Sequence, residues 1–154
     1  MQYRRVKNDD LDELLRLFYE TVTLVCSVDY NEDQIRVWTS SVNKTQKWLD
    51  RINNQYFIIA EMDGKIVGFG SLENSNYIDL LYVHKDYLRK GVASFLLSEL
   101  EKESDLQQKQ SIISDVSITA RPFFEKHGYK VLKEQKHMIE GVEVVNYKMI
   151  KEKA

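Results

Sequence analysis

The N-terminal third of the chain follows a helical pattern of apolar residues. Apolar side chains spaced three and four positions apart predict an amphipathic helix after a short strand at residues 2–6. The apolar positions of this helix are Leu11, Leu14, Leu15, Phe18, Val22 and Val25. Asn31 and Gln34 have the spacing of a capping box, which predicts a second helix through Trp38. A third helix is expected over residues 43–52.

Most of the remaining chain alternates as strands do. Segments joined by short turns predict an antiparallel meander with strands at 56–62, 66–72 and 77–83. The last of them is apolar apart from Asp79, a pattern typical of a strand buried on both faces. After a further helix we expect a strand at 112–116, a short helix at 120–127, and a hairpin of 129–139 and 142–150. The predicted fold class is α/β (α+β), with one domain over residues 1–154 and a single mixed, mostly antiparallel central sheet flanked by helices.

The turn after strand 77–83 carries distinctive chemistry. It contains Arg89, Lys90 and Gly91, and it leads into a helix with apolar residues at Val92, Phe95, Leu96 and Leu100. The first turn of a helix offers free N–H groups and the positive end of the helix dipole, which together favour anions. Gly91 has no Cβ, so a phosphate can approach the main chain closely. The segment predicts a pyrophosphate site, although a glycine between strand and helix also occurs as plain turn chemistry.

Two runs resemble the motifs of the GNAT N-acetyltransferases. The run Leu88-Arg89-Lys90-Gly91-Val92-Ala93 is similar to the acyl-CoA loop of that family, Gln/Arg-x-x-Gly-x-Gly/Ala, with Leu88 in place of Gln/Arg. The run from Ser117 to Tyr129 is similar to Asn-x-x-Ala-x-x-Phe-Tyr-Glu-Lys-x-Gly-Phe, with Ser117 in place of Asn and Phe124 in place of Tyr. The expected elements also follow the family's order over essentially the whole chain, so the resemblance implies the GNAT fold.

The resemblance also implies a co-substrate and the residues that bind it. It implies direct transfer of the acetyl group of acetyl-CoA to an amine, without a metal. Main-chain contacts to the pantetheine arm are expected from Leu81, Tyr82 and Val83. The pyrophosphate is expected on Arg89, Lys90, Gly91, Val92, Ala93 and Ser94, and the second wall of the site at Ser117 and Phe124. Because phenylalanine cannot donate a proton, the leaving thiolate is protonated by another group, by water, or not at all.

Asp79 is the expected catalytic base. A carboxylate inside an apolar strand is costly unless it is paired or functional. The period of the strand places it on the same face as Tyr77, Leu81 and Val83. The alternative is a structural Asp79, tied to a neighbouring backbone group or arginine. Asp115 on the next strand is a second candidate base.

The resemblance places the acceptor site under the segment before residue 56. Tyr30 and Trp38 stand at helical spacing there, and we expect both to contact the acceptor together with Tyr77. The alternative for such an aromatic stripe is packing. Cys26 lies at the end of an apolar helix stripe and is expected in the core rather than as a nucleophile.

The composition of the chain indicates which partners and which cellular compartment to expect. The net charge of −2 with interspersed signs indicates no nucleic-acid surface, and no apolar run approaches the roughly 20 residues of a membrane helix. The single cysteine and the lack of a signal-peptide core favour the cytoplasm. We expect a small-molecule or peptide amine as partner, and leave open a homodimer. Two other function classes also stay open: a catalytically silent acyl-CoA-binding regulator, and a nucleotide-binding module for ATP or NAD.

Overall fold

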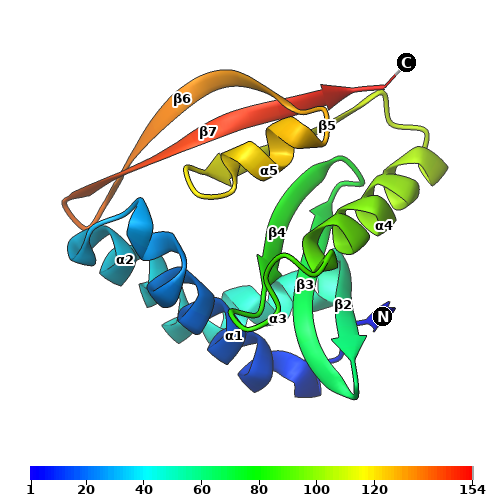
Figure 1. Ribbon diagram of the computed structural model, residues 1–154, viewed down its shortest axis with the longest axis horizontal. Helices are drawn as coiled ribbons and strands as arrows, with labels where there is room; N and C mark the ends of the chain where they lie inside the picture. The colour runs from blue at the N-terminus through cyan, green and yellow to red at the C-terminus, as the bar shows by residue number, and fades with distance from the viewer. Residues whose placement is uncertain (154) are drawn as a thin grey trace.

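The computed structural model describes residues 1–153 and is built around one seven-stranded sheet (Figure 1). Ala154, the last residue of the expected domain, lies outside the described residues. The strands are β1 (Gln2–Arg5), β2 (Tyr56–Met62), β3 (Lys65–Glu73), β4 (Tyr77–Val83), β5 (Ser111–Ser117), β6 (Lys130–Ile139) and β7 (Val142–Glu152). Their order in the sheet is β1-β2-β3-β4-β5-β7-β6, and all neighbours are antiparallel except the parallel pair β4–β5. The predicted mixed, mostly antiparallel sheet is confirmed.

Helices cover both faces of this sheet (Figure 1). One face carries α1 (Leu11–Leu24), α2 (Glu32–Thr39) and α3 (Thr45–Asn54), and the other carries α4 (Val92–Leu106) and α5 (Arg121–Lys126). Single 3-10 turns, which have no apolar period for the sequence to reveal, occur at Asn8–Asp10, Cys26–Val28 and Ser40–Asn43. Within residues 1–153, no helix is both long enough and apolar enough to cross a membrane.

An aromatic layer fills the core between the sheet and helices α1 and α3. Phe18 and Trp48 meet edge to face with ring centroids 5.2 Å apart, and Phe57 stacks on Phe69 at 5.7 Å. The ring centroid of Tyr82 lies 5.0 Å from that of Phe18. Such pairs add about 0.5–1.5 kcal/mol beyond the area that they bury. This layer therefore fixes β3 and β4 beneath the N-terminal helices.

Two glycines let α4 lie close to β3 on the opposite face. A Cβ added at Gly68 would stand 2.8 Å from Val92 Cγ1, and one at Gly70 would stand 3.1 Å from Leu100 Cδ1. Both distances are shorter than packed side chains normally reach, so only glycine allows this approach. The close contact holds the start of α4 next to the end of β4.

The predicted capping box of the second helix is confirmed. The Asn31 side chain accepts from the Gln34 N–H at 2.9 Å, and the Gln34 side chain accepts from the Asn31 N–H at 2.9 Å. Gln34 Nε2 also donates to the Glu143 carbonyl at 2.9 Å. These bonds start α2 and tie it to β7, beneath the far end of the β6–β7 hairpin (Figure 1).

Strand β4 is less buried than its sequence predicts. Ile78 and Leu80 are buried at 2% and 4% exposure, whereas the other residues of the strand are partly exposed. The reason is that β5 pairs with β4 at only two positions, Tyr77–Ile113 and Ile78–Ser114. The prediction of a strand buried on both faces is therefore wrong, and the second half of β4 borders an open side of the sheet.

An ion pair joins β1 to the turn that precedes α1. Arg4 donates through both terminal nitrogens to the two carboxylate oxygens of Asp10, at 2.9 Å each. The Lys7 N–H donates to the same carboxylate at 2.8 Å. These bonds hold the pKa of Asp10 below its ordinary value of 3.8, and the bonds from Arg4 contribute most to this lowering. The carboxylate is therefore more stable in the folded chain than in the unfolded chain.

We predict that Asp10→Asn removes an acid-sensitive part of the folding free energy. Because the folded pKa is depressed, this stabilisation is present above pH 3.8 and is lost as the pH falls through the lower folded pKa. The variant should lose about 1–3 kcal/mol at pH 7, and this deficit should disappear as the pH falls through the lowered folded pKa. Urea unfolding between pH 7 and pH 2 measures this. Asp33→Asn, which breaks an exposed pair with Arg36, is the control and should change stability by less than about 0.5 kcal/mol. A constant Asp10→Asn deficit down to pH 2 would contradict the assignment.

Candidate functional site

A slot opens between β4 and β5 where the two parallel strands separate. Their last pair is Ile78 and Ser114. The Ser114 hydroxyl donates to the Ile78 carbonyl at 2.8 Å. At the point of separation, this carbonyl is therefore hydrogen-bonded to a side chain. Beyond this point β5 continues beside β7, and β4 continues beside β3. The slot therefore has its apex at Ile78 and Ser114 and widens toward the end of β4.

Main-chain groups of Leu81 and Val83 face this slot. In an antiparallel ladder, hydrogen-bonded pairs alternate with non-bonded pairs. The His84 N–H donates to the Val67 carbonyl at 2.8 Å, so these two residues form a bonded pair. Bonded pairs recur at every second residue, so Tyr82 and Phe69 form the next one. The intervening residues Leu81 and Val83 then point away from β3, toward the side that β5 has left. The ladder thus engages the main chain of Tyr82 with β3 and leaves Leu81 and Val83 open.

The α1 helix bonds one of these open groups. Thr21 Oγ1 donates to the Val83 carbonyl at 2.8 Å. The N–H groups of Leu81 and Val83 and the carbonyl of Leu81 are left facing the slot. A backbone polar group away from water needs a partner, so this edge is suited to an extended ligand with amide groups.

A bulge interrupts β4 at Asp79. The register passes from Leu72–Ile78 directly to Ser71–Leu80, so Asp79 is the extra residue. Leu81 and Val83 consequently pack against the α4 face of the sheet, whereas the Asp79 carboxylate reaches α3 on the opposite face. The expectation that Asp79 shares a face with Leu81 and Val83 is wrong, because the bulge shifts the period by one residue.

Asp79 forms an ion pair with an arginine that the sequence did not single out. Arg51 Nε lies 3.0 Å from Asp79 Oδ2, and Gln55 Nε2 donates to the same oxygen at 2.9 Å. The Arg51 guanidinium also lies over the Trp48 ring, 5.0 Å from its centroid. Both charged side chains are 17% exposed. This arrangement matches the structural alternative for Asp79.

Tyr77 and Asp115, expected as acceptor contact and second candidate base, lie together. The Tyr77 hydroxyl donates to Asp115 Oδ2 at 2.7 Å, and Gln135 Nε2 donates to Oδ1 at 2.7 Å. Gln135 also donates to Asn146 Oδ1 at 3.0 Å, and His137 Nε2 lies 2.9 Å from that oxygen. Burial, reinforced by the bond to Asp115, raises the pKa of Tyr77. A line of polar side chains thus crosses β4, β5, β7 and β6.

A polar hollow of about 560 Å³ lies beside Tyr77 and Asp79. The rest of its lining comes from α3, the residue after it, the last residue of β3 and the turn that follows: Lys47, Asp50, Arg51, Asn54, Gln55, Glu73 and Asn74. All of these side chains are polar or charged. The hollow therefore suits a hydrophilic ligand.

The start of α4 has the features of an anion site. Gly91 is the N-cap with φ +81°, and no side chain within residues 1–153 caps the helix there. A Cβ added at Gly91 would meet no described atom within 4 Å, so the space above it is open. The first helical bond runs from the Phe95 N–H to the Gly91 carbonyl at 3.0 Å, which leaves the N–H groups of Val92, Ala93 and Ser94 without helical acceptors. Arg89 and Lys90 precede this turn.

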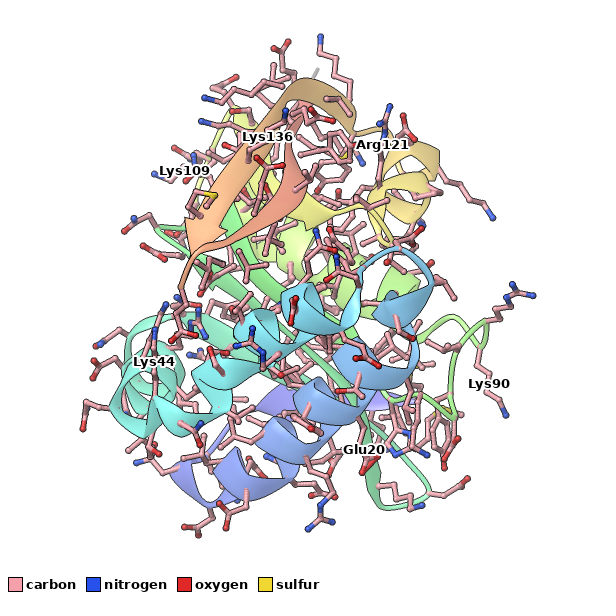
Figure 2. The ribbon with its side chains drawn as sticks, turned by 90° about the vertical axis from the view of Figure 1, so that its left-hand side faces the viewer. Glu20, Lys44, Lys90, Lys109, Arg121 and Lys136 are labelled. Carbon is pink, nitrogen blue, oxygen red and sulfur yellow. The ribbon has the colours of Figure 1, made fainter. Side chains whose placement is uncertain are left out.

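The two motif runs meet in space. Ser94 Oγ in the first turn of α4 lies 3.2 Å from His127 Nε2 at the end of α5. Figure 2 shows Lys90 at the tip of the β4–α4 loop, on the same side of the view as Arg121 at the start of α5. The predicted pyrophosphate loop and the predicted second wall therefore flank one region.

The second-wall residues have structural contacts of their own. Ser117 Oγ accepts from the Ala120 N–H at 3.0 Å and so shapes the turn into α5. Phe124 is 3% exposed and packs edge to face against Phe123 and Tyr129. No proton donor therefore occupies position 124, and its ring belongs to the core.

Tyr30 holds the α2 region against the C-terminal hairpin. Its side chain is 4% exposed, and its hydroxyl donates to the Val145 carbonyl at 2.6 Å and accepts from the Ile118 N–H at 2.9 Å. The half-buried Trp38 meets its ring edge to face at 5.1 Å. Cys26 is buried, as expected, and burial raises the pKa of its thiol to about 11. This placement of Tyr30 matches the packing alternative for the aromatic stripe.

Comparisons with known proteins show the family to which this chain belongs. The sequence profile of the family described as "Acetyltransferase (GNAT) domain" matches residues 26–151. The chain is 32% identical over 149 residues to the uncharacterised N-acetyltransferase YafP of Escherichia coli K12, covering 97% of this chain and 94% of that protein. The structure of a GCN5-related N-acetyltransferase from Rhodopseudomonas palustris matches with a TM-score of 0.95 at 30% identity, covering 99% of this chain and 95% of that one.

A more distant structure shares the fold. The PaiA N-acetyltransferase from Thermoplasma acidophilum, in complex with coenzyme A, matches with a TM-score of 0.80 at 22% identity, covering 99% of this chain and 98% of that one. The resemblance drawn from the two motif runs is confirmed by the family profile and by the relatives of higher identity. The chain therefore belongs to the GNAT acetyltransferase family and is an acyltransferase enzyme.

Proposed function

We propose that this enzyme transfers the acetyl group of acetyl-CoA directly to the amine of a hydrophilic acceptor. The observation that carries the proposal is the path formed by the open main-chain groups of Leu81 and Val83 at the end of β4 and, next along the chain, the open start of α4 at Gly91. That path offers amide partners first and an anion site at its end, which is the order of groups along the pantetheine and pyrophosphate of coenzyme A. Coenzyme A is bound in the PaiA relative, whose fold is similar.

The residues along the path fit coenzyme A. Leu81 and Val83 would bond the pantetheine amides through main-chain atoms, as in the pairing of an added strand. The N–H groups from Arg89 to Ser94 would hold the pyrophosphate, with added charge from Arg89 and Lys90. Tyr82 supports this edge with its ring, and Ser117 and Phe124 support the second wall from below. Bound acetyl-CoA would supply a thioester, and an N–H of Leu81 or Val83 aimed into the slot would stabilise negative charge on its carbonyl oxygen.

The acceptor would approach from the face that carries α1 to α3. Tyr77 and Asp79 lie on that face next to the slot apex, and the polar hollow begins there. A hollow lined mainly by polar and charged side chains favours a small hydrophilic amine or a polar peptide end. Tyr30 and Trp38 would shape this side of the site, Tyr30 as a buried support and Trp38 as its half-buried neighbour.

The first prediction of the proposed function concerns ligand class. Calorimetry should show binding of acetyl-CoA and CoA and much weaker binding of ATP and NAD, because only the former extend along β4. Incubation with acetyl-CoA and a panel of hydrophilic amines should release free CoA thiol, which a thiol-detecting dye measures. Binding of CoA without thiol release from any amine would instead identify a silent acyl-CoA-binding protein. Preference for ATP or NAD would identify a nucleotide-binding module.

The second prediction concerns Gly91. Gly91→Val should weaken CoA binding at least tenfold, because the new side chain fills the open space above the helix start. Gly141→Val is a matched control, since Gly141 has φ +80° and also meets no described atom within 4 Å of an added Cβ. Both variants should lose at least about 1–2 kcal/mol of folding stability from left-handed strain. Equal CoA affinity in the two variants would refute the pyrophosphate site.

The third prediction concerns the ion pair at the bulge. Asp79→Asn should cost about 1–3 kcal/mol of folding stability, because it breaks charge-assisted bonds at a largely buried site. Arg51→Gln should cost a similar amount, and the double variant should lose clearly less than the sum. Denaturant unfolding of the four proteins measures the coupling. Additive losses, together with a 10²–10⁴-fold fall in turnover for Asp79→Asn, would return Asp79 to the role of base.

A further inference from the structure

Two carboxylates flank the apex of the slot. The strands part after Ile78 and Ser114, and the next residues on β4 and β5 are Asp79 and Asp115. Both side chains lie on the α1–α3 face, because Asp79 reaches Arg51 there and Tyr77, which lines the same hollow, reaches Asp115. An acceptor nitrogen that enters at the apex therefore meets one carboxylate from each strand.

The charge of Asp79 is already compensated. Arg51 Nε stands 3.0 Å from Oδ2, and Gln55 donates to the same oxygen. An arriving ammonium would meet the guanidinium as well as the carboxylate, so the pair presents no net charge to it. Protonation of Asp79 would also remove its negative charge and so break the ion pair with Arg51. Asp79 is therefore a poor partner for a cation and a poor proton acceptor.

The charge of Asp115 is not compensated in this way. Of the Lys, Arg and His nitrogens that the structure describes, none lies within 4.0 Å of its carboxylate. Tyr77 and Gln135 are neutral donors, one on each oxygen, at 2.7 Å. A carboxylate offers about four lone-pair positions, so each oxygen keeps one for a ligand. The residue is exposed on this face.

The groups around Asp115 are few. Lys148 stands opposite it on β7, Asp79 lies across the slot on β4, and His137 on β6 connects to it through Asn146 and Gln135. Tyr77 stays a hydrogen donor at neutral pH, because burial raises the pKa of its hydroxyl. The two donors therefore fix the plane of the carboxylate without neutralising its charge.

We propose that Asp115 binds the ammonium group of the acceptor and takes its proton, with Tyr77 and Gln135 as positioning residues. The inference rests on the acetyltransferase function proposed above. One proton passes from nitrogen to a carboxylate oxygen of Asp115, and the freed lone pair forms the N–C bond with the thioester carbonyl carbon. The C–S bond breaks as its electron pair goes to sulfur. The second proton leaves nitrogen and ends on sulfur, which gives the amide and free thiol.

The test compares the wild-type chain with Asp115→Asn, Tyr77→Phe and a control, Asp105→Asn. Asp105 lies in the last turn of α4, on the other face of the sheet, and pairs with Lys153 at 2.9 Å, so the control removes a carboxylate of the same size far from the slot. Calorimetry with CoA present measures the binding of 1,3-diaminopropane, glucosamine and glycinamide, with 1,3-propanediol as the uncharged probe. Thiol release from acetyl-CoA with the tightest-binding amine then gives kcat and kcat/KM against pH. Melting temperatures show that each variant is folded.

The wild type should bind at least one amine and not the diol. Asp115→Asn should weaken amine binding at least tenfold, lower turnover 10²–10⁴-fold and remove the acidic limb of kcat/KM. Tyr77→Phe should weaken binding several-fold and keep that limb, whereas Asp105→Asn should match the wild type.

The proposal is overturned if Asp115→Asn binds the amines as tightly as the wild type, or if the wild type binds none of them. It also falls if Asp79→Asn, and not Asp115→Asn, loses the acidic limb. These outcomes differ from failure of the proposed function, which is an absence of CoA binding or of thiol release in the wild type. Amine binding is measured without turnover, so it tests Asp115 in either case.

Discussion

The separation of β4 from β5 is the constraint on which the site depends. A parallel pair inside a sheet normally continues and buries its main-chain groups. Here the Ser114 hydroxyl donates to the Ile78 carbonyl, and the pairing of β4 with β5 ends at these two residues. The main-chain groups of Leu81 and Val83 therefore face an open side of the sheet. The cost of unpaired backbone groups is offset when a ligand pairs with them. The fold tolerates the opening because α4 is anchored on β3, where Gly68 and Gly70 allow close contact, rather than in the slot.

In the proposed reaction, the two faces of the sheet would receive reactants of opposite charge. The α4 face presents a helix start with Arg89 and Lys90, which matches an anionic cofactor. The opposite face presents Asp115, whose carboxylate has no Lys, Arg or His nitrogen of residues 1–153 within 4.0 Å and would suit a cationic amine. The slot joins the faces at its apex. In that reaction, the anionic donor and the cationic acceptor would meet at the apex.

Local patterns predicted much of this architecture, whereas contacts between distant segments escaped them. The capping box of Asn31 with Gln34 depends on neighbours in sequence, and the structure contains it as predicted. The position of Asp79 was mispredicted because a regular strand period was assumed, and a bulge shifts that period by one residue. Arg51 and Gln135 went unnoticed for a different reason: neither belongs to a motif, and only the packing of α3 and β6 brings them to the site.

Asp79 acts on the site through the backbone in this arrangement. A bulge leaves one residue without a ladder partner, and its side chain must find one elsewhere. Arg51 supplies that partner at 3.0 Å and is itself held over the Trp48 ring. The ion pair therefore anchors the bulge to the aromatic layer beneath α3. Because the bulge determines which way Leu81 and Val83 point, the ion pair that holds Asp79 also helps to set the geometry of the slot.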